Sequence, residues 1–68
     1  MLYDAIIESY TKQARLLEQR LQEIRQDKTI HRDDTYSTRV ALLEQEILEL
    51  KTAAEHLRER QYMYNDKN

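Results

Sequence analysis

The chain has 68 residues, of which 40% are hydrophobic and 35% charged, and its formal net charge is −2. It contains no glycine, proline, cysteine, tryptophan or phenylalanine, which excludes disulfides and thiolate metal sites and removes the residues that most β-turns need. The small net charge argues against whole-molecule attraction to nucleic acid or to an anionic membrane. Because helix-forming residues supply most of the chain, we expect a single all-α domain over residues 1–68.

The first predicted helix covers about residues 2–28. Its apolar residues recur at alternating spacings of four and three, which is the period of a coiled-coil seam. One stripe of this helix is therefore expected to face a partner helix. The seam residues are Tyr3, Ile7, Tyr10, Ala14, Leu17, Leu21 and Ile24.

The heptad phase breaks within the stretch DKTIHRDDTYST, residues 27–38. Ile24 and Tyr36 are 12 residues apart, whereas an unbroken repeat would place equivalent positions 7 or 14 apart. In a continuous helix the apolar stripe would jump by about 120°. One long helix would then present two half-length seams to two different partners, so a hairpin is the simpler interpretation.

Local residue chemistry also favours a turn at about residues 29–35. Among residues 29–38 only Arg32 is a good helix former, and forcing these ten into a helix costs about 5 kcal/mol. Cationic residues precede two aspartates, an order that suits the end of one helix and the start of the next. We therefore expect Asp33 or Asp34 to be the N-cap of the second helix.

The second predicted helix covers about residues 36–62, and residues 63–68 are expected to form a frayed tail. Apolar residues again alternate at spacings of four and three. With the first helix they predict an antiparallel, coiled-coil-type two-helix hairpin. The seam residues are Tyr36, Val40, Leu43, Ile47, Leu50, Ala54 and Leu57.

A turn near residue 32 predicts which residues face each other across the seam. Residue numbers of partners should sum to about 64, so that Leu17 meets Ile47. The same register makes three flanking charge pairs favourable and one, Glu18 with Glu44, unfavourable. The favourable pairs are Asp4 with Arg58, Arg20 with Glu46, and Asp27 with Arg39.

Several apolar residues lie outside the two seams. Stripes wider than a seam are typical of helices in a bundle, so we expect two hairpins to dimerise into a four-helix bundle. Two alternatives stay open: scattered surface leucines, or a subunit that covers this stripe with a different protein. The candidate interface residues are Leu2, Ile6, Leu16, Leu42 and Leu48, with Ala41 and Ala53 beside them.

The outward face of the first helix carries a candidate nucleic-acid surface of Lys12, Arg15, Arg25 and Lys28. Two-fold pairing of hairpins would double this basic strip, which could contact phosphates. In length and helix arrangement only, the hairpin resembles the small plasmid copy-number RNA-binding proteins of the Rop type, and the resemblance implies an RNA-binding dimer. Interspersed glutamates favour an ordinary solvated face instead.

Tyrosines gather at the end of the predicted hairpin away from the turn. Tyr3, Tyr10, Tyr62 and Tyr64 lie there with Met63, and tyrosine and methionine are enriched at protein interfaces. A partner-binding patch is one interpretation. Seam packing of Tyr3 and Tyr10 beside a frayed tail is the other.

No motif predicts catalysis or ligand binding. His31 and His56, on different helices, have no companion histidine or cysteine, and the chain contains neither a glycine-rich phosphate loop nor a Ser-His-Asp arrangement. We expect no enzyme activity, cofactor, metal or small-molecule substrate. The predicted function is that of a self-associating hairpin acting through protein–protein contacts as an adaptor, assembly element or regulator.

No membrane or export segment is expected. Apolar runs fall short of the roughly 18 residues needed to span a bilayer. The first ten residues carry Asp4 and Glu8 and no basic region, unlike a signal peptide. The predicted location is the cytoplasm.

Overall fold

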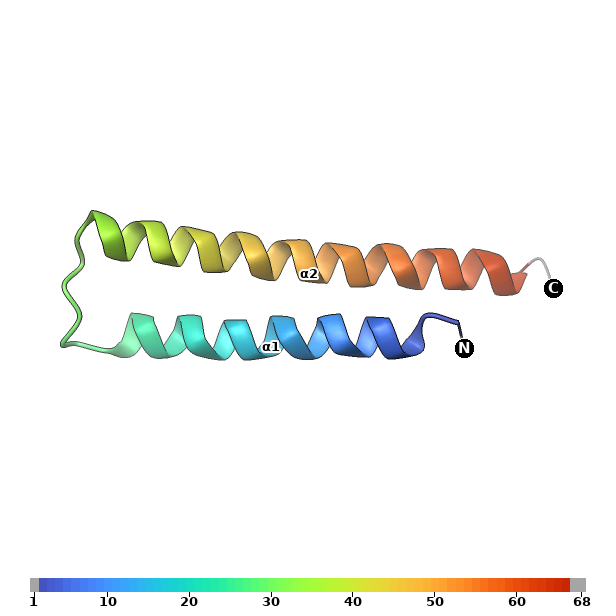
Figure 1. Cartoon of the computed structure of the whole chain (residues 1–68), viewed down its shortest axis with the longest axis horizontal. Helices are drawn as coiled ribbons and strands as arrows, with labels where there is room; N and C mark the ends of the chain where they lie inside the picture. The colour runs from blue at the N-terminus through green and yellow to red at the C-terminus, as the bar shows by residue number, and fades with distance from the viewer. Residues whose placement is uncertain (1, 67–68) are drawn as a thin grey trace.

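The protein is an antiparallel helical hairpin (Figure 1). The computed structural model describes residues 2–66, and the side chains of residues 2–63. Helix α1 (Asp4–Gln26) and helix α2 (Asp34–Asp66) lie side by side, and the described residues contain no strand. The predicted all-α hairpin is therefore confirmed. The radius of gyration is 16.0 Å and the extents are 55 × 16 × 11 Å, whereas a compact chain of this length has a radius of about 11 Å.

The helix bounds differ from the predicted ones by a few residues. The connecting segment occupies residues 27–33, two residues earlier than predicted, because α1 ends at Gln26 and α2 begins at Asp34. Helix α2 continues to Asp66, although the sequence predicts fraying from residue 63. Residues 57–61 are good helix formers, and no glycine or proline interrupts residues 57–66. Residues 67 and 68 lie outside the described part.

Asp27 ends helix α1 in place of a glycine. Its backbone turns into the extended region, at φ −77° and ψ 111°, while its amide still donates to the carbonyl of Glu23. The carboxylate Oδ1 accepts hydrogen bonds from the amide of Thr29 (2.9 Å) and from its hydroxyl (2.6 Å). This local arrangement stabilises a turn without a left-handed residue. Accordingly, the described residues contain no positive φ angle.

Arg32 links the two helix ends. Its Nη2 donates to the carbonyl oxygen of Arg25 at 2.8 Å, which satisfies an acceptor in the last turn of α1. The guanidinium lies 5.2 Å from the ring centroid of Tyr36 in the first turn of α2, and Nη1 donates to the Tyr36 hydroxyl at 3.3 Å. One side chain thus combines a C-terminal cap with a cation–π contact.

Asp33 is the N-cap of helix α2. Its Oδ1 accepts a hydrogen bond from the amide of Tyr36 at 3.0 Å, and its carbonyl accepts from the amide of Ser37. This is the geometry in which an aspartate satisfies an otherwise unpaired amide in the first turn. Of the two predicted candidates, Asp33 is therefore the cap, and Asp34 is the first helical residue.

The core is the seam between the helices. Every one of the fourteen predicted seam residues is buried or half-buried. At the open end the seam continues through Gln61, whose Oε1 accepts from the amide of Tyr3 at 2.8 Å. This contact keeps the predicted register, in which partner numbers sum to about 64. The buried hydrophobic residues of the described chain are Ile7, Ala14, Leu21, Ile47 and Ala54.

We expect the substitution D33A to lower the free energy of unfolding by about 1 kcal/mol, because the Tyr36 amide loses its acceptor. Urea unfolding followed by far-ultraviolet circular dichroism measures the change. D33N keeps an acceptor and should restore most of the loss. D34A is the matched control, because it removes only a first-turn charge that is worth about 0.3 kcal/mol. A larger loss for D34A than for D33A would contradict the cap assignment.

The Thr29 hydroxyl and amide lower the pKa of Asp27 below its ordinary value of 3.8 by hydrogen bonding to its carboxylate. This stabilisation is complete above the unfolded-state pKa and is lost as the pH falls through the lower folded-state pKa. T29V removes the hydroxyl donor, so we expect it to move the pKa of Asp27 back toward 3.8. An NMR titration of the carboxyl carbon tests this, with T52V on α2 as control. A wild-type Asp27 that titrates at or above 3.8 would refute the interaction.

Candidate interaction surfaces

One flank of the seam is lined by polar pairs that connect the helices, and we call it the ladder side. Glu18 of α1 forms an ion pair with Lys51 of α2 at 3.0 Å, and Arg25 forms another with Glu44. One heptad toward the open end, Arg58 Nη2 donates to the Thr11 hydroxyl at 3.3 Å, and that hydroxyl donates to the carbonyl of Ile7. The three cross-helix pairs recur every seven residues along both helices.

The pairing on the ladder side corrects the predicted flanking pairs. The sequence predicts Glu18 opposite Glu44 and Asp4 opposite Arg58, but Glu18 instead meets Lys51. Helical side chains lean toward the N-terminus of their own helix. In an antiparallel pair two long side chains therefore reach toward each other from levels about one turn apart. Glu18 and Glu44 therefore do not face each other, and each pairs with a cation, Lys51 and Arg25 respectively.

The other two predicted charge pairs do not form. Within the described chain Arg20 makes no ion pair with Glu46, and Asp27 makes none with Arg39. The Asp27 carboxylate instead accepts hydrogen bonds from Thr29. These positions lie on the flank opposite the ladder side. Among the described residues, this opposite flank has no ion pair between the helices.

Gln61 closes the open end of the seam. Its Nε2 donates to Asp4 Oδ1 at 2.8 Å, while its Oε1 accepts from the Tyr3 amide. The hydrogen bond from Gln61 lowers the pKa of Asp4 below its ordinary value of 3.8. One amide thus holds both the backbone and the first acidic residue of α1 against α2.

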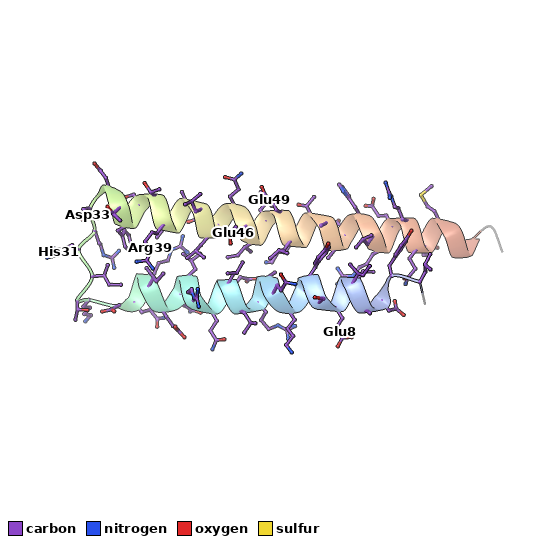
Figure 2. All side chains as sticks on the ribbon, viewed as in Figure 1. Glu8, His31, Asp33, Arg39, Glu46 and Glu49 are labelled. Atoms are coloured by element: carbon purple, nitrogen blue, oxygen red, sulfur yellow. The ribbon has the colours of Figure 1, made fainter. Side chains whose placement is uncertain are left out.

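The opposite flank, which we call the groove side, carries an apolar groove of about 610 Å³. Gln13, Glu46 and Glu49 are its polar residues, and Figure 2 shows Glu46 along the edge of α2 that is turned toward α1. The ladder side has a depression of about 570 Å³, but its only apolar lining residues are Ala14 and Ala54. The two depressions therefore have similar volumes and differ in the residue types that line them. The apolar lining of the groove consists of Tyr10, Leu16, Leu17, Leu50 and Ala53.

All five candidate interface residues are exposed, but they do not share one face. Leu16 lines the groove, whereas Leu2 precedes the first residue of α1. Ile6 and Leu42 precede the groove residues Gln13 and Glu49 by one heptad each, so both also lie on the groove side.

Leu48 lies on the other side. It precedes Glu55 by one heptad, and Glu55 lines the ladder-side depression. Leu16 and Leu48 are 57% and 65% exposed. They are therefore two leucines of similar exposure on opposite sides of the hairpin. Leu48 therefore lies apart from Ile6, Leu16 and Leu42, and the five-residue interface stays a prediction.

The basic residues of α1 do not form a uniform strip. Lys12, Arg15, Arg25 and Lys28 are all exposed, but Arg25 is paired with Glu44. Lys12 and Arg15 share a depression with Arg58 and two carboxylates. One of these is Glu8, which Figure 2 shows on the outer edge of α1. Opposite charges are thus interleaved where the phosphate-binding interpretation requires an unbroken positive surface.

At the tyrosine-rich end of the hairpin, some of the side chains are half-buried and others are exposed. Tyr3 and Tyr10 are half-buried in the seam, whereas Tyr62 is 73% exposed and Met63 61% exposed. The side chain of Tyr64 lies outside the described part. Tyr10 is also part of the groove, so among the described tyrosines it lies apart from the exposed Tyr62.

His31 and His56 are both exposed, and His31 lies in the connecting segment (Figure 2). Among the described residues no three histidine, cysteine or acidic side chains are grouped so that they could hold a metal ion. Neither helix, over the range described, combines the length and the apolar character needed to cross a bilayer.

No protein-family model, curated protein or solved structure matches the chain.

The ion pair between Glu18 and Lys51 predicts the sign of a charge reversal. E18K places two cations together, so we expect it to lower the free energy of unfolding by up to about 1 kcal/mol, and E18K/K51E to restore it. A double-mutant cycle of urea unfolding at low salt measures the coupling. The sequence-based pairing of Glu18 with Glu44 predicts the opposite sign, so a stabilising E18K would refute the observed pairing of Glu18 with Lys51.

Proposed function

We propose that this protein is a self-associating helical hairpin that acts in the cytoplasm through protein–protein contacts, as an adaptor, assembly element or regulator. Its two helices form a scaffold rather than a catalytic centre. The surfaces available for binding a partner are the flanks of the seam. The most direct partner is a second copy of the chain, which would complete a four-helix bundle.

The exposed area of the single hairpin is the observation that carries this proposal. The chain exposes 5818 Å² of surface, whereas a compact monomer of 8.3 kDa exposes about 4,600 Å². The excess of about 1,200 Å² arises because two helices have one seam and no second layer. In most domains a second layer of secondary structure packs against helices such as these and covers their apolar surface.

Burial within the seam supports the same proposal. Five hydrophobic residues of the described chain are buried, and two of them are alanines. Large side chains of the seam, among them Leu17 and Leu50, are only half-buried because they also border the groove. Another helical layer would bury these side chains and the exposed leucines beside them, at about 25 cal/mol per Å² of apolar area.

Nucleic-acid binding has weaker support. Of its four candidate residues, Arg25 already pairs with Glu44, and two others share a depression with carboxylates. The formal net charge of −2 also opposes phosphate binding.

Sedimentation equilibrium and light scattering test self-association. We expect a mass of twice the 8.3 kDa of one chain and a melting temperature that rises with protein concentration. A folded, helical chain with the mass of one protomer at high concentration would refute self-association and indicate a different protein as partner. Salt-sensitive binding to RNA or duplex DNA would instead support the nucleic-acid function.

A further inference from the structure

We infer that two copies of the hairpin pack groove side against groove side, with α1 of one copy antiparallel to α2 of the other. This inference rests on the proposed self-association and names the surface that performs it. The partner is a second copy of this chain. The ladder side stays exposed to solvent.

The chemistry of the two flanks separates them. On the ladder side three polar pairs already satisfy one another, and only two alanines are apolar in its depression. On the groove side Leu16 projects beside half-buried Tyr10, Leu17 and Leu50, so a covering helix would remove a continuous apolar strip from water. Contiguous exposed apolar area bordered by polar residues marks an association site.

The amount of surface fits one additional copy. A stable interface buries about 800 Å² on each partner. The excess exposure of about 1,200 Å² over a compact monomer, from a total of 5818 Å², is enough to supply such an interface. Ile6 and Leu42 extend the apolar surface beyond the groove toward both ends of the hairpin.

Charges on the groove side make it self-complementary. Arg20 follows Gln13 by one heptad and Arg39 precedes Glu46 by one heptad, so both arginines lie on this side, and Figure 2 shows Arg39 and Glu46 along one edge of α2. Within the described chain Arg20, Arg39 and Glu46 form no ion pair. The same surface thus offers both a cation and an anion to its copy, as a two-fold interface requires.

The positions of these charges also select the orientation. Arg20 and Glu46 lie at nearly the same level of the hairpin, since seam partners sum to about 64. A two-fold axis along the hairpin places α1 of one copy over α2 of the other, so Arg20 meets Glu46 of the second copy. The helix dipoles of that pair are antiparallel. An axis across the hairpin would instead gather the glutamates of both grooves, because the groove lies near the helix midpoints.

The test compares Leu16 with Leu48, two leucines of similar exposure on opposite sides. We expect L16E to raise the dimer dissociation constant on the order of 100-fold or more, because a charge is then buried between the copies. L48E should dimerise like the wild type. Sedimentation equilibrium measures the constants. If L16E does not fold, the milder variants L16A and L48A are compared by melting curves at several protein concentrations. Only L16A should lower the melting temperature of the dimer.

The outcomes separate a failure of the groove-side interface from a failure of self-association itself. A dimeric wild type that L48E dissociates and L16E does not would overturn the groove-side interface while leaving self-association in place. A monomeric wild type would refute both. For the orientation, R20E and E46R should each weaken the dimer, and R20E/E46R should restore it. Failure of that restoration would overturn the pairing of α1 with α2 across the interface.

Discussion

Ala14 and Ala54, each 2% exposed, are the most deeply buried residues of a seam that is the whole core of this hairpin. Two packed helices share one seam, and each helix can bury only the stripe that faces the other. Residues on this stripe recur every three and four positions, which fixes how the helices are rotated about their axes. Most described residues beside the stripe stay exposed. The long shape, the two flanks and the large surface area all follow from this constraint.

The connection between the helices shows how polar side chains can replace glycine in a tight turn. Asp27 and Thr29 form a local turn that ends α1, Asp33 caps α2, and Arg32 joins the last carbonyls of one helix to the first aromatic ring of the other. Arg32 and Asp33 each satisfy a backbone group that a helix end leaves unpaired, and the hydrogen bonds of Thr29 to Asp27 stabilise the turn. A chain without glycine or proline thus reverses direction with ordinary backbone angles.

The two flanks of the seam have different roles. The ladder side favours one register of the helices, and the groove side is the surface proposed for association. On the ladder side, ion pairs such as Glu18 with Lys51 favour one alignment of the helices, and their exposure limits their contribution to stability. On the groove side, Leu16 and its neighbours are exposed apolar area that gains free energy only when something covers it. The proposed dimer uses the second flank and leaves the first unchanged. A thin hairpin can in this way be both a folded unit and half of a bundle.

By itself the sequence determined the helices, the turn and the seam, because heptad spacing, the phase break at residues 27–38 and weak helix formers are local properties of the chain. It also limited the cap of α2 to two adjacent aspartates. Only the tertiary structure decided that Glu18 meets Lys51 and not Glu44, since that outcome depends on the lean of long side chains across an antiparallel pair. It likewise placed Leu48 apart from the other exposed leucines, because the two flanks acquire separate chemistry only when both helices are set side by side.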